Sequence, residues 1–174
     1  MKAAFGLPIV LVLLLALALR LPGVFYGLPL TSLVGDEPSM ILGALKMLEL
    51  HTLVPALHSQ EFATLLYYPP YLSYLFLPFF AAILGVEYFL WGGSHALFAS
   101  YALSDLSPFF IAARLCVAAS SLASVWLVYR VAQALWRSER AALASAFLFA
   151  TSLLDVGLSA VVRHWVPAAV FFLL

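Results

Sequence analysis

Long apolar runs are the feature of this sequence that most limits how it can fold. Residues 3–21, 108–135 and 141–162 each hold at most two charged side chains, and residues 71–91 hold one. About twenty residues of α-helix, at about 1.5 Å per residue, cross a hydrocarbon core of about 30 Å. Only 9% of the residues are charged, against about a quarter in soluble domains, which is too few to build a water-facing surface. We therefore expect an all-α, polytopic membrane protein.

The charge balance and the cysteine content exclude other classes. The formal net charge is zero, and no basic run is present. Nucleic acid is therefore not expected as a partner, because its binding relies on clustered lysine and arginine. The single cysteine, Cys116, lies in an apolar run, which predicts a packing thiol and neither a disulfide framework nor a cysteine metal site.

The N-terminus predicts a retained first span. Lys2 followed by an apolar stretch has the beginning of a secretory signal peptide. However, the run continues to Arg20-Leu-Pro-Gly23 without a small-residue cleavage site, so we interpret residues 3–21 as membrane-spanning.

An amphipathic helix is predicted in the polar stretch 22–70, which we expect to be an external loop. Asp36 is suited to cap this helix and Pro38 falls in its first turn, where a missing N–H costs nothing. Apolar residues recur near helical spacing within residues 37–50, at Met40, Ile41, Leu45 and Leu48. We expect the helix to lie at the membrane surface.

Orientation follows from the positive-inside rule. Lys2 and the arginines at 130, 137 and 140 are expected in the cytoplasm, and the acidic loop outside. If residues 71–91 and 108–135 each crossed once, however, the arginine turn would end outside. Either 71–91 belongs to an interfacial or re-entrant element, or the stretch 71–105 makes two passes. Pro78 and the neighbouring tyrosines favour the interfacial alternative.

The last apolar run, 165–174, has about half the length that a crossing needs. We therefore interpret residues 1–174 as a single transmembrane module that is part of a longer protein.

Asp36 and Glu37 are the first candidates for chemistry. Two adjacent carboxylates just beyond the first span suit a reaction at the membrane face. One can act as a general base toward an acceptor hydroxyl or amine, or hold a divalent cation that neutralises a phosphate leaving group. The alternative is a capped surface helix, because acidic residues favour helix N-termini.

Arginines supply the second set of candidates. Arg163, with His164 beside it, is expected at headgroup level, where a guanidinium can bind a phosphate or simply snorkel. Arg114 lies deeper in its span, where a charge usually faces a cavity or a partner. Tyr68 could line a sugar or lipid groove, and Asp155 is either a buried functional carboxylate or an interfacial one.

A metal site has only a weak signal in the sequence. His51, His58 and Glu61 share the external loop, but their spacing fits no helical pair of ligands. We therefore assign no metal ligands. A divalent cation remains possible as a cofactor.

Together these motifs resemble the start of the protein O-mannosyltransferase-like family. The similarity runs in order through essentially the whole chain. It rests on Arg20-Leu-Pro-Gly-Val-Phe-Tyr-Gly-Leu-Pro29, Gly35-Asp-Glu-Pro38, Tyr67-Tyr-Pro-Pro-Tyr71, Ser107-Pro-Phe-Phe-Ile-Ala-Ala-Arg-Leu115, Val128-Tyr-Arg130 and the turn from Leu135. The family consists of integral-membrane glycosyltransferases of the GT-C class, related to the bacterial aminoarabinose-to-lipid-A transferases.

The resemblance implies a GT-C-type N-terminal transmembrane module with amphipathic juxtamembrane helices in its first external loop. Such enzymes transfer a sugar, with inversion, from a polyprenyl-phosphate carrier to a protein or lipid/glycan acceptor on the outer face. Asp36 is then the expected base with Glu37 beside it. Arg114 and Arg163 would orient the carrier phosphate or the fold around it. Membrane lipids are further partners, and a prokaryotic plasma membrane is the expected location.

One motif departs from the family pattern. Where relatives read Ser-x-x-x-Arg-x-Asp-x-Pro, this chain reads Ser159-Ala-Val-Val-Arg163-His-Trp165-Val-Pro167, with tryptophan at the second acidic position. This favours the alternative of a non-catalytic or truncated relative that binds lipid or packs with a partner. The resemblance also implies that this part of the enzyme is inactive alone. A small transporter or channel is disfavoured, because the spans hold few polar residues besides Arg114.

Overall fold

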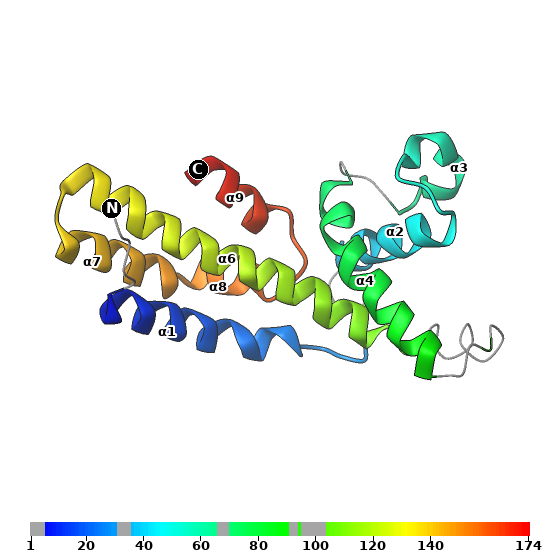
Figure 1. The fold of residues 1–174 in the computed structure, drawn as a ribbon, viewed down its shortest axis with the longest axis horizontal. Coiled ribbons are helices and arrows are strands. Elements are labelled where there is room, and N and C mark those ends of the chain that lie inside the picture. Colours follow the sequence, from blue (N-terminus) through cyan, green and yellow to red (C-terminus); the bar gives the residue numbers. More distant parts are fainter. Residues whose placement is uncertain (1–5, 31–35, 66–69, 91–93, 95–103) are drawn as a thin grey trace. The chain divides into compact units, whose positions relative to one another are not determined.

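The computed structural model describes residues 6–30, 36–65, 70–90, 94 and 104–174 (Figure 1). These residues form helices and turns, and no strand occurs among them. The all-α prediction is confirmed to this extent. In chain order the helices are α1 (Leu7–Val24), α2 (Glu37–Glu49), the 3-10 helix η1 (Pro55–His58), α3 (Ser59–Phe62), α4 (Tyr71–Leu90), α6 (Ser107–Trp136), α7 (Glu139–Ala150), α8 (Leu153–Ser159) and α9 (Trp165–Leu173).

Three of these helices, α1, α4 and α6, are long and apolar enough to cross a membrane. Helix α6 covers the predicted span 108–135 almost to the residue, and α1 continues three residues past the predicted end at residue 21. The predicted span 141–162 instead forms two helices, α7 and α8, which are bent by 54° and pass the same test only as a pair.

The break between α7 and α8 has a local cause. Thr151 donates its hydroxyl hydrogen to the carbonyl oxygen of Phe147 at 2.9 Å, which competes for a helical acceptor. Ser152 then adopts an extended backbone at the N-cap of α8. Small hydroxyl residues favour such caps and turns over helix interiors.

Contacts divide the chain into two compact units. The first, which we call the terminal unit, consists of Met1–Tyr26 and Val117–Leu174, and the second, the central unit, is Gly27–Cys116. Helix α6 contributes its beginning to the central unit and the rest to the terminal unit.

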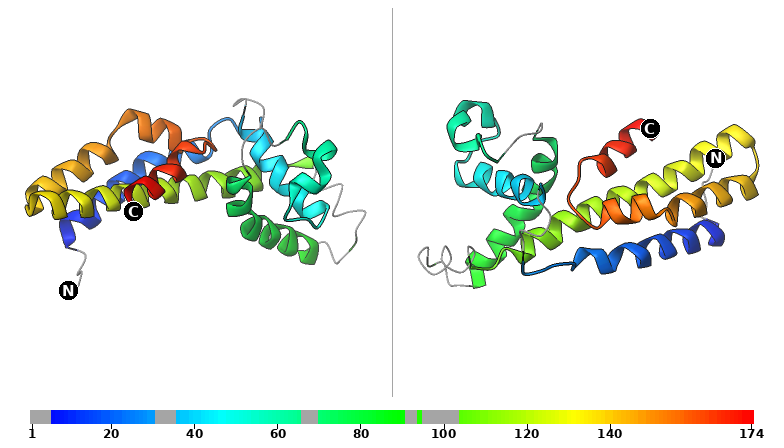
Figure 2. Two further views of the ribbon diagram at one scale, coloured as in Figure 1. Left: turned by 90° about the horizontal axis from the view of Figure 1, so that it is seen from above. Right: turned by 180° about the vertical axis from the view of Figure 1, so that it is seen from behind.

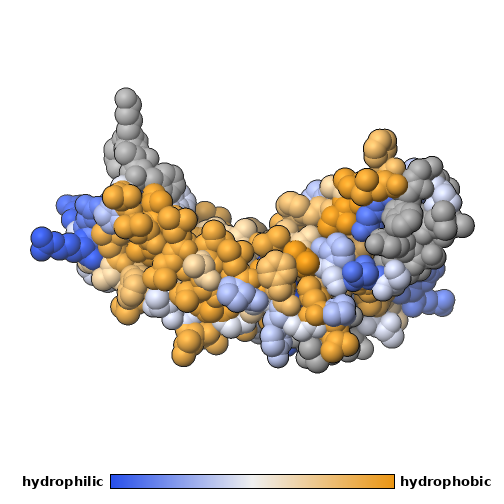
Figure 3. All heavy atoms as spheres, turned by 90° about the horizontal axis from the view of Figure 1, so that it is seen from below, coloured by the Kyte–Doolittle hydropathy of each residue, from blue (hydrophilic) through white to orange (hydrophobic). Residues whose placement is uncertain are grey.

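In the terminal unit α1 packs against α7 and α8, and the later part of α6 runs beside them (Figure 2). The core contains buried Ile9, Ala16, Val125, Ala146 and Ala150. Alanine at three of these positions lets the helix backbones approach closely, as small residues do between membrane helices. The outward faces are apolar, and hydrophilic side chains gather at the end that holds the α6–α7 turn (Figure 3).

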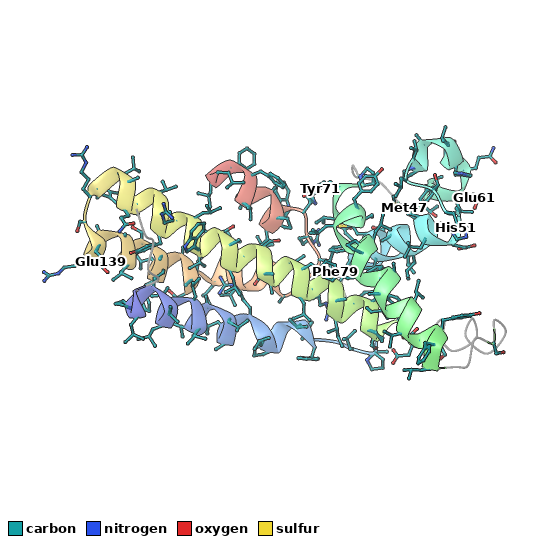
Figure 4. The ribbon with its side chains drawn as sticks, viewed as in Figure 1. Met47, His51, Glu61, Tyr71, Phe79 and Glu139 are labelled. Atoms are coloured by element: carbon teal, nitrogen blue, oxygen red, sulfur yellow. The ribbon has the colours of Figure 1, made fainter. Side chains whose placement is uncertain are left out.

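The ends of α1 and α6 fix the path of the chain in the terminal unit. A Cβ atom at Gly6, just before α1, would lie 3.8 Å from Oε1 of Glu139, which follows the α6–α7 turn (Figure 4). The start of α1 and the arginine turn therefore lie at the same end of the terminal unit. The positive-inside rule expects this, because it puts Lys2 and the arginine turn on one side of the membrane, although Lys2 itself lies outside the described residues. The chain leaves this unit after Tyr26 and re-enters at Val117, at the opposite end.

This path constrains what lies between α1 and α6. If the terminal unit spans a membrane, residues 27–116 must cross it an even number of times. Helix α4 is long enough to cross, so a crossing by α4 requires a second one before α6. Most of residues 91–103, between α4 and α6, lie outside the described part. The interfacial alternative for 71–91 and the two-pass alternative for 71–105 both remain predictions.

Gly23 is required where α1 meets the end of α8. A Cβ atom at Gly23 would lie 2.5 Å from Cβ and 3.0 Å from Cα of Ala160, well inside the contact distance of about 3.5–4.0 Å between carbon atoms. We expect Gly23→Ala to destabilise the protein by about 1–3 kcal/mol, because the two helices must move apart. Thermal unfolding in detergent measures this. Gly157→Ala on α8 is the matched control, since its Cβ would meet nothing within 4 Å, and equal stability of both variants would contradict the prediction.

The central unit is built on α2 and α4. Helix α2 buries Met40, Ile41, Ala44 and Met47, of which Met47 is labelled in Figure 4. The predicted apolar face has Leu45 and Leu48 where the structure buries Ala44 and Met47. Both leucines are only half-buried. Spacing alone fixes an apolar face to within one residue. The side chain of Ser73 on α4 donates a hydrogen bond to the carbonyl oxygen of Met40 at 3.0 Å, which joins the two helices.

Aromatic side chains join α4 to the beginning of α6 within the central unit. The rings of Phe76 and Phe80 stack with centroids 5.7 Å apart, and Phe80 meets Phe109 edge-on at 5.2 Å. All three rings are buried, so this end of α6 is fixed against α4. Arg114 lies about one turn further along α6.

Candidate functional site

The first turn of α2 holds the two candidate carboxylates in different surroundings. Asp36 occupies the N-cap position and is half-exposed, whereas Glu37 is fully buried. The expected cap is not formed, since the Asp36 side chain makes no capping hydrogen bond to the described backbone of α2. Ser39 instead donates to the carbonyl oxygen of Asp36 at 2.7 Å. The adjacent acidic residues are therefore not equivalent.

Glu37 forms a two-point ion pair with Arg114. Nε and Nη2 of Arg114 donate to Oε1 and Oε2 of Glu37, each at 2.7 Å. Both side chains are almost completely buried, with 0% and 3% of their surface exposed. The guanidinium also lies 5.9 Å from the ring centre of Phe110. A buried two-point pair of this kind is strongly directional, so it fixes the start of α2 against α6.

This pairing changes how Arg114 is interpreted. The sequence left open whether Arg114 orients a carrier phosphate or the surrounding fold. Because its guanidinium is engaged by the buried Glu37, the second role fits the geometry better. Arg114 and Glu37 together fix the start of α2, and with it the position of half-buried Asp36, the next residue back along the chain.

Arg163 and His164 lie together in the terminal unit, on the turn between α8 and α9. Both are half-exposed, and the rings of His164 and Trp165 are 4.5 Å apart. Trp165 begins α9 and is 60% exposed. Tyr68, the remaining candidate, lies outside the described residues. The structure thus pairs Glu37 with Arg114 in one unit and places Arg163 beside His164 in the other.

The donors near Asp36 do not fit a divalent cation held by two carboxylates. Glu37 directs both of its oxygens to Arg114. Across the described part of the chain, no group of three or more His, Cys, Asp or Glu side chains is arranged to hold a metal ion.

Of the weaker candidate ligands in the external loop, Glu61 is engaged elsewhere. Glu61 on α3 pairs with Lys46 at 3.3 Å, while His51 lies just past α2 (Figure 4). Lys46 also pairs with Glu49 at 3.0 Å, and this hydrogen bond raises the pKa of Lys46. These exposed groups form a surface charge cluster and leave the loop with no assigned metal site.

A third polar group lies in the terminal unit. Of its members, only Asp155 is a candidate from the sequence. Arg20, Ser121 and Asp155 are buried together, and Arg20 has no exposed surface. From the sequence, Arg20 is expected near the end of the first span, and Asp155 is either a buried functional carboxylate or an interfacial one. The signal available in the sequence was one positive and one negative charge inside separate apolar runs, since such charges usually pair.

Comparisons with models of protein families, with curated proteins and with solved structures find no match to this chain. What the protein does is therefore argued from its residues and their geometry. The fold itself defines the coarser class, an all-helical chain with three helices able to cross a membrane.

Proposed function

We propose that the chain is the N-terminal part of an integral-membrane glycosyltransferase that uses a polyprenyl-phosphate-linked sugar. The observation that carries this proposal is the buried Glu37–Arg114 pair directly beside half-exposed Asp36. A rigid mount for one accessible carboxylate is what a general base at a membrane face needs. The order of sequence motifs around this carboxylate supports the same reading.

The proposed reaction requires few groups from the protein. Asp36 takes the proton from the acceptor hydroxyl or amine, and the acceptor atom attacks the anomeric carbon of the sugar. The bond from that carbon to the phosphate oxygen breaks, and the polyprenyl phosphate leaves with the electron pair. Direct displacement inverts the anomeric configuration. From the sequence alone, Arg163 and His164 are proposed to bind the phosphate, because a guanidinium matches its oxygens in a two-point geometry.

The membrane setting follows from the same proposal. The arginine turn after α6 lies in the cytoplasm, and Asp36 acts on the outer face of a multi-pass protein in a prokaryotic plasma membrane. The acceptor is a protein or a lipid-linked glycan. No metal-dependent step is included, since the carboxylates near Asp36 do not form a cation site.

The test is sugar transfer by membranes that contain the chain within its complete reading frame. Polyprenyl phosphate carrying a radiolabelled sugar is supplied, and label appearing in protein or in glycolipid is counted. We expect label to leave the carrier only in membranes that contain the protein. Carrier that stays fully labelled would contradict the glycosyltransferase proposal.

A non-catalytic relative is the alternative, and exposed Trp165 favours it. A bulky aromatic side chain replaces the carboxylate that the resemblance leads one to expect there. On this alternative the chain binds carrier lipid without turnover, so labelled carrier would be retained by the purified protein and returned unchanged.

A further inference from the structure

The side chain of Arg20 joins the helices of the terminal unit at one point. Its Nε donates to Oγ of Ser121 at 2.6 Å, and its Nη1 donates to the carbonyl oxygens of Ala16 at 2.7 Å and Ala150 at 3.1 Å. Nη2 forms an ion pair with Oδ2 of Asp155, and the Ser121 hydroxyl donates to the same oxygen. One buried guanidinium therefore contacts α1, α6, α7 and α8.

These contacts lie on both sides of the break in the bent segment. Ala150 is the last residue of α7, and Asp155 lies in the first turn of α8. The last carbonyl groups of a helix have no partner within it, and Arg20 donates to one of them. Its other arm pairs with the carboxylate beyond the break. Arg20 thus contacts both halves of this segment, which are bent by 54°.

The end of α8 is fixed against α1 a short distance away. Gly23, almost one turn after Arg20, meets Ala160, the C-cap of α8, with no room for a side chain between them. The turn that bears Arg163 and His164 follows within four residues. Two residues of α1 therefore fix the chain between the break and this turn. Arg20 does so through its ion pair with Asp155, and Gly23 through its close contact with Ala160.

We propose that Arg20 and Asp155 form a latch, meaning a buried ion pair that holds the α7–α8 bend and thereby positions the Arg163–His164 turn. The two side chains are positioning residues, since neither is accessible to a substrate. The effect on the carrier phosphate rests on the proposed function, whereas the latch itself does not. A latch differs from an ordinary stabilising pair because the geometry of α8 depends on it even when stability is restored.

The variants are chosen to separate geometry from stability. Arg20→Met and Asp155→Leu each leave one buried charge without its partner, which is strongly destabilising, while the double variant removes both charges. We expect each single variant to lower Tm by about 10 °C and the double variant to regain most of that loss. Arg130→Met is the matched control, because Arg130 is an exposed arginine on α6 that lies 5.3 Å from the Trp126 ring.

Spin labels measure the bend without any assay of activity. With Cys116 replaced by serine, labels are attached at Ala144→Cys on α7 and Leu154→Cys on α8, both exposed positions. We expect a single narrow distance distribution in the unaltered background and in Arg130→Met. The stable double variant should give a broad or shifted distribution, because the guanidinium no longer joins α7 to α8. A narrow, unshifted distribution in the double variant would overturn the latch.

Kinetics then test the positioning of the turn. In membranes that contain the complete reading frame, the double variant should raise KM for the polyprenyl-phosphate sugar by about tenfold with kcat nearly unchanged, since misplacement of a binding group weakens donor binding. Unchanged KM together with a changed label distance would overturn the positioning of the turn. If the unaltered protein transfers no sugar, the proposed function fails, and the label distances still decide whether the latch exists.

Discussion

Replacing Asp36 with asparagine is expected to reduce sugar transfer by about 10²–10⁴-fold while leaving the amount of folded protein unchanged. Asparagine has nearly the same shape as aspartate but cannot accept the acceptor's proton. Asp36 is half-buried and its side chain makes no capping hydrogen bond to the described backbone of α2, so the substitution removes no helix cap. Loss of turnover without loss of protein would therefore report on chemistry.

The measurement compares label transferred per folded molecule in membranes of the unaltered protein and of the variant. Asp105→Asn is the matched control, because Asp105 is another aspartate just before a helix, here the beginning of α6, and is exposed. Hydrogen bonding from the Ser107 side chain, together with the hydrogen bond from the Ser107 backbone N–H at 2.9 Å, lowers the pKa of Asp105. Transfer should persist in this control. Equal transfer in Asp36→Asn and the unaltered protein would remove Asp36 from the mechanism.

The helices able to cross a membrane are the part of the fold that the sequence determines most directly. Their length is set by the hydrocarbon core, so an uninterrupted apolar run such as 108–135 translates into a helix with little ambiguity. Helix α6 follows this run closely. Breaks are harder to predict, because hydropathy averages over residues such as Thr151 and Ser152 and does not record which carbonyl groups lose their partners.

Pairings between distant residues were beyond the sequence for a different reason. Arg114 and Glu37 were both singled out, but 77 positions separate them, and no periodicity in the sequence relates one to the other. Arg20 and Asp155 are 135 positions apart. Of these four residues, only Arg114 is expected from the sequence to be deep enough to need a cavity or a partner, and only packing determines which partner it finds.

The candidate site was therefore predicted residue by residue and not as an arrangement. Asp36 and Glu37 are acidic neighbours in the sequence, yet Glu37 is buried against an arginine and Asp36 is only half-buried. Adjacent positions at the start of a helix point about 100° apart, so one can face the interior while the other faces outward. This difference gives the two residues separate proposed roles, a base and its mount.

The second large effect is expected when the Glu37–Arg114 ion pair is broken. Arg114→Met leaves the Glu37 carboxylate buried without its partner, and removal of one member of a buried pair costs about 3–5 kcal/mol. Glu37→Gln likewise leaves the Arg114 guanidinium buried without a charged partner. We expect either variant to lower thermal stability sharply and the double variant, Glu37→Gln with Arg114→Met, to recover much of the loss.

Surface and conservative variants make this prediction specific. Glu49→Gln removes one partner of the exposed Lys46 pair and should change stability little, because exposed pairs are weak. Glu37→Asp keeps the charge but shortens the side chain, so the two-point contact with Arg114 cannot form unchanged. A folded Glu37→Asp protein should therefore lose kcat with little change in donor KM, since Asp36 is displaced while the phosphate-binding groups are not.

The double variant separates a structural pair from a catalytic mount. If the pair only stabilises the fold, the recovered protein should transfer sugar at the unaltered rate. If the pair holds Asp36 in place, stability should return while transfer per folded molecule stays at least about tenfold low, because general-base catalysis requires hydrogen-bond geometry to the acceptor. Full transfer in the stable double variant would confine Glu37 and Arg114 to the architecture of the central unit. It would leave Asp36 as a base whose position is set by other contacts of α2.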